Sequence, residues 1–169
     1  MQRSVGARRR LRTLVCRDRM SLTYGLSTAK ELLEKLRRDA ALLDEEVTSD
    51  RFFNFVVTGY SLIDWVRNDP AVPAAAKSVV SSLYSDSWIK VCGDLATASK
   101  HFVLTTRVPV TADASSQRGW GAGRFGKGGW GVGEESIVVT LNDGTTYSGL
   151  DLVKEVLQTW DRFFVTHGV

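Results

Sequence analysis

The residues of this chain best suited to chemistry are a histidine and the polar groups spaced around it. Asp94, Thr97 and His101 lie three and four residues apart, which places them on one side of a predicted helix. A neutral imidazole can accept or donate a proton near pH 7. His101 is therefore a candidate general base, with Lys90 on the same face and Lys100 next to it in sequence.

Asp64, on the preceding predicted helix, is the carboxylate that can pair with this histidine. If the two helices are neighbours, Asp64 can favour the charged imidazole. The catalytic interpretation combines His101, Lys100, Asp94 and Asp64 in one site. The structural alternative is a buried polar contact, in which His101 is hydrogen-bonded to Asp64 or to a backbone carbonyl and fixes the helix register.

A second candidate site is the run RGWGAGRFGKGGWGVGE over residues 118–134, in which an aromatic residue recurs every five positions. A five-residue period fits neither a helix nor a strand, so the run predicts a repeated loop that displays Trp120, Phe125 and Trp130. Such rings can bind a protein partner or stack on nucleobases, and nearby basic groups can contact phosphates. These basic residues are Arg118, Arg124 and Lys127. The alternative is that the rings pack onto the body of the protein, with glycines permitting tight turns.

Charge is unevenly distributed along the 169 residues. Residues 1–19 contain seven arginines and one acid, a charge of +6, whereas residues 20–169 carry −3. We expect residues 1–19 to be a disordered basic arm that attracts phosphates, or to precede a true start at Met20. Residues 20–169, in a chain that is 43% hydrophobic, predict a single domain.

Several classes of protein are disfavoured by composition. Cys16 and Cys92 are the only cysteines, and they form neither a disulfide framework nor a zinc motif. No apolar run approaches the roughly 18–20 residues that span a bilayer. No phosphate-loop pattern is present among the glycines. We therefore expect a cytoplasmic protein with no metal, no cofactor and no membrane association.

Apolar residues at helical spacing predict about five helices. Thr28 and Glu31 have the spacing of a capping box at the start of the first helix, and Ser49-Asp50 is expected to cap the second. The second helix is apolar around most of its circumference, which favours a central position. The expected helices begin near residue 28, then cover 50–68, 73–84 and 87–105, and the last runs from about 148 to Gly168.

The segment between the last two helices is expected to be non-helical. Residues 106–136 predict a loop that includes the aromatic tract, and 137–147 predict a β-hairpin around Asp143-Gly144. The last helix carries the strongest apolar stripe and must bury it against the others. The predicted fold is thus mainly α: a helical bundle with a glycine/aromatic loop and one β-hairpin inserted before the last helix.

Two stretches, FFNFVVTGYSLIDWV and CGDLATASKHF, resemble a group of small bacterial and phage-encoded proteins of unassigned function. In that group an aromatic pentad tract, a hairpin ending in Asp-Gly and a last aromatic helix follow in the same order. The resemblance covers residues 28–164, and Thr97-Ala98 stands where Asn-Gly is usual. It implies a helical bundle and a prokaryotic or phage setting, with no assigned activity.

The helix of His101 also resembles, more remotely, the HEPN superfamily of helical bundles. Many of its members are metal-independent ribonucleases with an Arg-x(4–6)-His motif. Residues 93–96 contain no arginine, so the motif is incomplete here. A second subunit would have to supply a cation such as Lys100 or Arg107.

Three functions follow as hypotheses. The favoured one is a non-catalytic accessory protein that binds a protein partner or itself through the aromatic tract. The second is a HEPN-type ribonuclease, a toxin or phage-defence component, with His101 as general base. The third is a sequence-non-specific nucleic-acid binder that uses the N-terminal arginines together with the tract.

Overall fold

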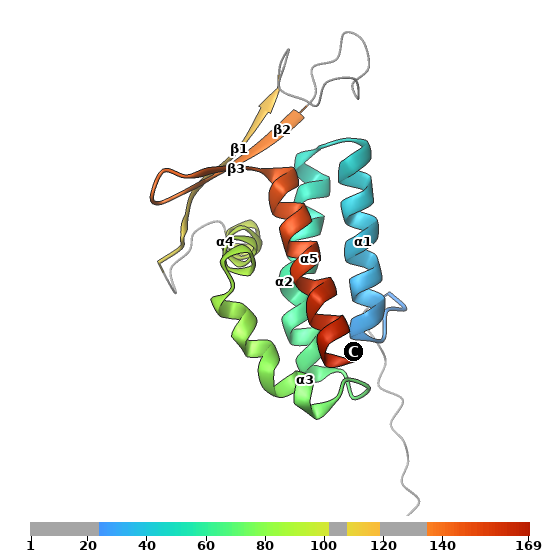
Figure 1. Cartoon of the computed structure of the whole chain (residues 1–169). Helices are drawn as coiled ribbons and strands as arrows, with labels where there is room; N and C mark the ends of the chain where they lie inside the picture. Colours follow the sequence, from blue (N-terminus) through green and yellow to red (C-terminus); the bar gives the residue numbers. More distant parts are fainter. Residues whose placement is uncertain (1–23, 102–107, 119–134) are drawn as a thin grey trace, which may run out of the picture.

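The computed structural model describes residues 24–101, 108–118 and 135–169. The elements are α1 (Ala29–Glu45), α2 (Ser49–Asn68), α3 (Ala74–Val79), the 3₁₀ helix η1 (Val80–Ser85), α4 (Ser87–His101), β1 (Thr111–Arg118), β2 (Glu135–Leu141), β3 (Thr146–Ser148) and α5 (Gly149–His167). The predicted fold class is confirmed: helices dominate, and a small antiparallel sheet precedes the last helix (Figure 1).

The helices begin where side chains can bind free backbone N–H groups. The capping box of Thr28 and Glu31 is formed as predicted. The prediction for α2 was wrong by one residue, because Thr48 and not Ser49-Asp50 accepts the hydrogen bond from Arg51 N. At the other end of the fold, α5 begins after Ser148 and ends at Gly168, whose φ of 63° is left-handed.

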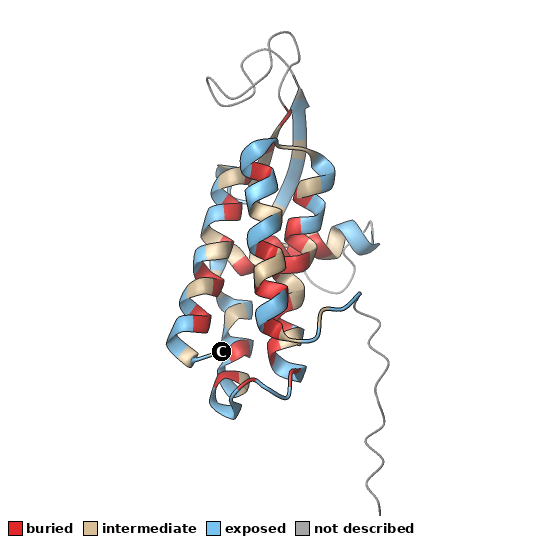
Figure 2. Cartoon of the chain, turned by 90° about the vertical axis from the view of Figure 1, so that its right-hand side faces the viewer, coloured by how far each residue is buried: buried red, intermediate tan, exposed pale blue. Residues whose placement is uncertain are grey.

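The core lies between α1, α2 and α5, which run side by side, and α4, which crosses them (Figures 1 and 2). As predicted, α2 is central and packs against α1, α4 and α5. Trp160 of α5 is fully buried, and its Nε1 donates a 2.9 Å hydrogen bond to the carbonyl of Gly59 on α2. This pairing satisfies the indole donor inside an apolar core.

The sheet has the order β1-β2-β3, with antiparallel neighbours. Alternate residues of β2 are buried, with Ile137 and Val139 facing the bundle. The hairpin predicted at Asp143-Gly144 is confirmed, and Gly144 has a φ of 85° in its turn. The loop predicted over 106–136 was wrong in part, because Thr111–Arg118 forms strand β1 against β2, and β2 begins at Glu135.

The remaining predictions on elements have mixed outcomes. The helix predicted over 73–84 is a short α-helix followed by a 3₁₀ helix. The helix predicted over 87–105 ends at His101 among the described residues, and 102–107 lie outside them. The basic arm over 1–19 and most of the aromatic tract, residues 119–134, also lie outside the described residues. No helix in the part of the chain that is described has the length and apolar character to cross a bilayer.

Candidate functional site

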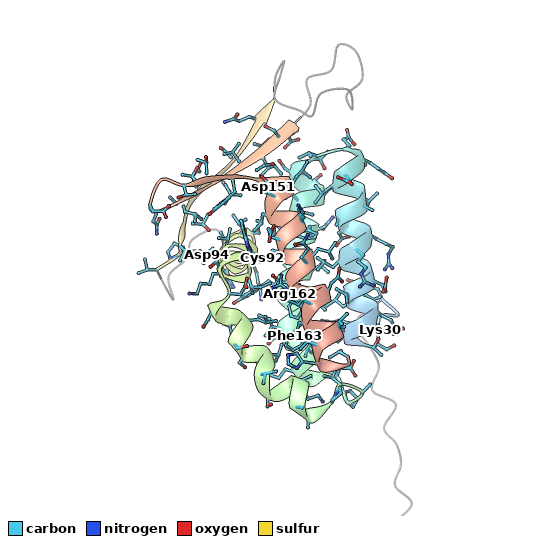
Figure 3. All side chains as sticks on the ribbon, in the orientation of Figure 1. Lys30, Cys92, Asp94, Asp151, Arg162 and Phe163 are labelled. Atoms are coloured by element: carbon cyan, nitrogen blue, oxygen red, sulfur yellow. The ribbon has the colours of Figure 1, made fainter. Side chains whose placement is uncertain are left out.

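Asp94 lies on the side of α4 that faces the start of β1, whereas Cys92 lies on the side that faces the helices (Figure 3). Only 2% of Asp94 is exposed. Its Oδ2 accepts hydrogen bonds from the backbone N–H groups of Val110, at 2.7 Å, and Thr111, at 3.1 Å. The start of β1 therefore covers the part of the helix face that Asp94 was predicted to share with His101. The carboxylate fixes the start of β1 on α4.

The histidine site is not brought together by the fold. His101 is exposed at the last residue of α4, and Lys100 beside it is also exposed. Asp64 is exposed too, and its Oδ1 pairs at 2.9 Å with Arg67 of the same helix. The predicted contact between His101 and Asp64 required α2 and α4 to be neighbours, and they are. The prediction of a buried contact was nevertheless wrong, because both side chains are exposed. Within the described ranges no hydrogen bond orients the imidazole.

Thr97 and Lys90, the other polar residues of this face, also have separate surroundings. The Thr97 hydroxyl donates a 2.6 Å hydrogen bond to the carbonyl of Gly93, one helical turn earlier. Lys90 lines an open hollow of about 340 Å³ between the start of α4 and the β2–β3 turn. Sequence reasoning missed this hollow because its lining comes from three separate stretches of the chain. Its lining is Ser87, Lys90, Val91, Val110, Leu141, Asn142 and Asp143.

A polar cluster that sequence reasoning missed joins α1 to α2. Lys35 Nζ contacts Asp39 Oδ2 at 2.6 Å and Thr58 Oγ1 at 2.8 Å, and Thr58 Oγ1 lies 3.0 Å from Asp39 Oδ2. The hydroxyl of Thr58 is also 2.7 Å from the carbonyl of Asn54. The i, i+4 spacing of Lys35 and Asp39 was a usable signal. These groups satisfy one another, so the cluster is a contact between helices rather than an activated nucleophile.

Cys92, the one described cysteine, is unsuited to chemistry. It is fully buried, and burial raises the pKa of its thiol to about 12. Its Sγ donates to the carbonyl of Val56 at 3.3 Å. Only the thiolate is a nucleophile or metal ligand, so this protonated side chain acts as a small core residue.

Glu135 is the second buried carboxylate of functional interest, because it follows the aromatic tract directly. It is 8% exposed, and it accepts hydrogen bonds from Ser49 N at 3.1 Å and Ser116 Oγ at 2.5 Å. The Ser49 hydroxyl donates to the same oxygen. Ser49 is the first residue of α2, where a negative charge is favourable. Glu135 therefore holds the end of the sheet on the N-terminus of α2, and sequence reasoning missed it.

The aromatic tract is bounded by a paired position of the sheet. Arg118 is the register partner of Glu135, so the two ends of residues 119–134 lie opposite each other in neighbouring strands. The side chains of Trp120, Phe125, Trp130, Arg124 and Lys127 lie outside the described residues. What the fold supplies is a fixed base for the tract, at the end of β1 and β2 that Glu135 holds on the N-terminus of α2 (Figure 1).

No metal site is present in the part of the chain that the structure describes, where no three His, Cys, Asp or Glu side chains gather. Comparison of the chain with models of protein families, with curated proteins and with solved structures found no match. The resemblance to small phage and bacterial proteins, and to the HEPN superfamily, therefore stays a prediction.

Proposed function

We propose that this chain is a non-catalytic accessory protein that binds a protein partner, or a second copy of itself, through the aromatic tract. The observation that supports the proposal most directly is the pairing of Arg118 with Glu135. Since Glu135 is also held by Ser49 of α2, both ends of the tract start from a rigid base. A rigid base lowers the entropy that a binding loop loses when it meets its partner.

The chemistry of the tract supports a protein partner. Trp, Tyr and Arg are enriched among the residues that carry most of the energy of protein interfaces. The tract offers Trp120, Phe125 and Trp130, with Arg124 and Lys127 between them. Glycines between the rings let the backbone approach a partner surface closely.

The polar groups elsewhere support the non-catalytic part of the proposal. Asp94 is engaged by two backbone N–H groups, and Asp64 is paired within its own helix. A general base works best when a second group orients it. Among the described residues His101 has no such group.

The test is to place a photocrosslinking phenylalanine analogue at Phe125 and to irradiate cells that produce the full chain. The matched control carries the analogue at Val165, an 84% exposed position on α5. We expect one discrete crosslinked species from Phe125, identified by mass spectrometry, and its loss when Trp120 and Trp130 are replaced by Ala. Equal crosslinking from both positions, or none from Phe125, would overturn the proposal.

A further inference from the structure

Strand β1, eight residues long, is an edge strand of the sheet in the part of the chain that the structure describes. In the order β1-β2-β3 both outer strands are edges, but they differ in how they are protected. β3 has three residues, and its Tyr147 packs edge-on against Trp88 of α4 with ring centroids 4.9 Å apart. β1 is longer and mostly exposed, and no described strand pairs with its outer side, where Asp94 of α4 meets only the first residue, Thr111 (Figures 1 and 2). Long uncovered edges invite pairing with another strand.

The hydrogen bonds of β2 identify which backbone groups of β1 point outward. Leu141 N donates to Thr145 O on the β3 side, whereas Asn142 N donates to Val110 O on the β1 side. Successive residues of a strand direct their backbone N–H and C=O groups to opposite sides. Counting back from Asn142, the N–H and C=O of Val138 point toward β1, where Ser115 is its register partner. Ser115 therefore uses its N–H and C=O within the sheet. Ala114 and Ser116, on either side of it, direct theirs away from β2.

The devices that usually block an edge are missing from the middle of β1. Proteins protect edges with proline, lysine, bulges or inward charges. The segment 114–117 reads Ala-Ser-Ser-Gln, with none of these. The irregularity in register lies earlier, between Thr111 and Asp113, and Asp94 already occupies the N–H groups of Val110 and Thr111. The open ladder thus begins at Ala114.

We propose that β1 pairs with β1 of a second copy of this chain, antiparallel across a two-fold axis at Ser115. In this register Ala114 lies opposite Ser116 of the partner subunit, and Asp113 lies opposite Gln117 of the partner subunit. The same pairs recur on the other side of the axis, as an isologous interface requires. No like charges face each other, and each Asp can accept a hydrogen bond from Gln. A second copy is favoured as the occupant because this register places no like charges opposite each other and forms the Asp–Gln pair twice.

The geometry gives a specific crosslinking test. At the axis the two Ser115 residues form a non-hydrogen-bonded pair, whose Cα atoms lie about 4.5 Å apart. That distance suits a disulfide. The two Asp113 residues of the dimer are four positions out of register, or about 13 Å apart. We expect Ser115→Cys to give a disulfide-linked dimer under mild oxidation, and Asp113→Cys to give roughly tenfold less.

Both variants are made in a Cys16→Ser background, so that only the introduced cysteine and Cys92 remain. Cys92 is fully buried and stays out of the reaction. Equal crosslinking of Ser115→Cys and Asp113→Cys would indicate random collision and overturn the proposal. Absence of crosslinking in both would overturn it as well.

A second experiment tests the backbone contact directly by sedimentation of the full chain. Ala114→Pro removes an outward N–H that β2 does not use, a substitution that edge strands tolerate. Ala114→Thr keeps this N–H and is the matched control. We expect wild type and Ala114→Thr to be dimers, and Ala114→Pro to be a monomer with an unchanged circular dichroism spectrum. A monomeric wild type would overturn the proposal.

This inference does not depend on the aromatic tract, and the two can be told apart. With Trp120, Phe125 and Trp130 all replaced by Ala, the strand-edge dimer is expected to persist. If that variant becomes monomeric while Ala114→Pro stays dimeric, self-association belongs to the tract. That result would support the proposed function and overturn the pairing of β1.

Discussion

Asp94 has a side chain of a type common in catalytic sites, but here it forms structural hydrogen bonds. A buried carboxylate has to be compensated by hydrogen bonds or charges. Here two backbone N–H groups, those of Val110 and Thr111, meet the same oxygen. The side chain therefore determines where the chain re-enters the fold after α4.

We expect Asp94→Ala to lower the free energy of unfolding by about 1–3 kcal/mol, because it leaves two backbone donors without their acceptor. Asp94→Asn keeps an accepting oxygen and should cost less. The measurement is urea denaturation followed by circular dichroism. Asp64→Ala is the control, since an exposed ion pair contributes less than about 1 kcal/mol. Equal losses for Asp94→Ala and Asp64→Ala would contradict this role.

His101 provides the opposite case, an exposed imidazole at a helix end. We expect purified wild-type protein to leave RNA intact in EDTA, and His101→Ala to be indistinguishable from it. The reason is that no hydrogen bond within the described residues orients the ring or activates it. Cleavage by the wild type that disappears in His101→Ala would establish a metal-independent ribonuclease, and the proposed non-catalytic function would then be wrong.

At the scale of elements, the sequence predicts best what depends on local spacing. The capping box of Thr28 and Glu31 and the left-handed end of α5 at Gly168 need only neighbours along the chain. β1 could not be predicted in this way, because TADASSQR has alanine as its only apolar residue type and contains no aromatic, valine or isoleucine. Residues 111–118 form a strand because they hydrogen-bond to β2, and the residues of β2 lie beyond position 134 in the sequence.

The candidate site was less predictable than the fold for a related reason. A helical wheel places Asp94 and His101 on one face, but it cannot say what returns to cover that face. The chain covers Asp94 with the start of β1 and leaves His101 exposed. Glu135 shows the same limit, because its partners Ser49 and Ser116 come from distant segments.

The contact between α2 and α4 depends on a glycine. A Cβ built at Gly93 would lie 2.5 Å from Cε2 of Tyr60, closer than atoms can approach. We expect Gly93→Ala to destabilise the fold by about 1–3 kcal/mol. Helix propensity alone would predict a gain of about 1 kcal/mol. The two effects therefore have opposite signs, and thermal or urea unfolding can decide between them.

A double-mutant cycle with Tyr60→Ala is the control for this contact. When the Tyr60 ring is absent, Gly93→Ala should become neutral or stabilising by up to about 1 kcal/mol. The same destabilisation in both backgrounds would show that Tyr60 is not what Gly93 accommodates.

The whole molecule combines a packed helical body with a sheet that extends past it (Figure 2). The large fully buried side chains, such as Trp160, Phe55 and Leu36, belong to the helices. The sheet contributes Ile137 and Val139 to this core, and Glu135 holds its far end on α2. Stability and partner binding are therefore expected to reside in different parts of the chain.

Replacing residues 119–134 by Asn-Gly between Arg118 and Glu135 separates these two properties. Arg118 and Glu135 are register partners, and the neighbouring pair Gln117 and Ser136 is the hydrogen-bonded one, so two inserted residues complete a four-residue hairpin loop closed by that pair. Each halving of a flexible loop lowers its closure cost by about 0.6 kcal/mol, so the change from 16 residues to two should stabilise the fold by up to about 2 kcal/mol. We expect unchanged helix content and a raised midpoint of urea unfolding.

The shortened chain should also lose its partner. We expect the protein that crosslinks to the tract in the full-length chain not to co-purify with the shortened chain. A loss of several kcal/mol would instead mean that the aromatic rings pack onto the helical body, and the tract would then serve the fold rather than a partner.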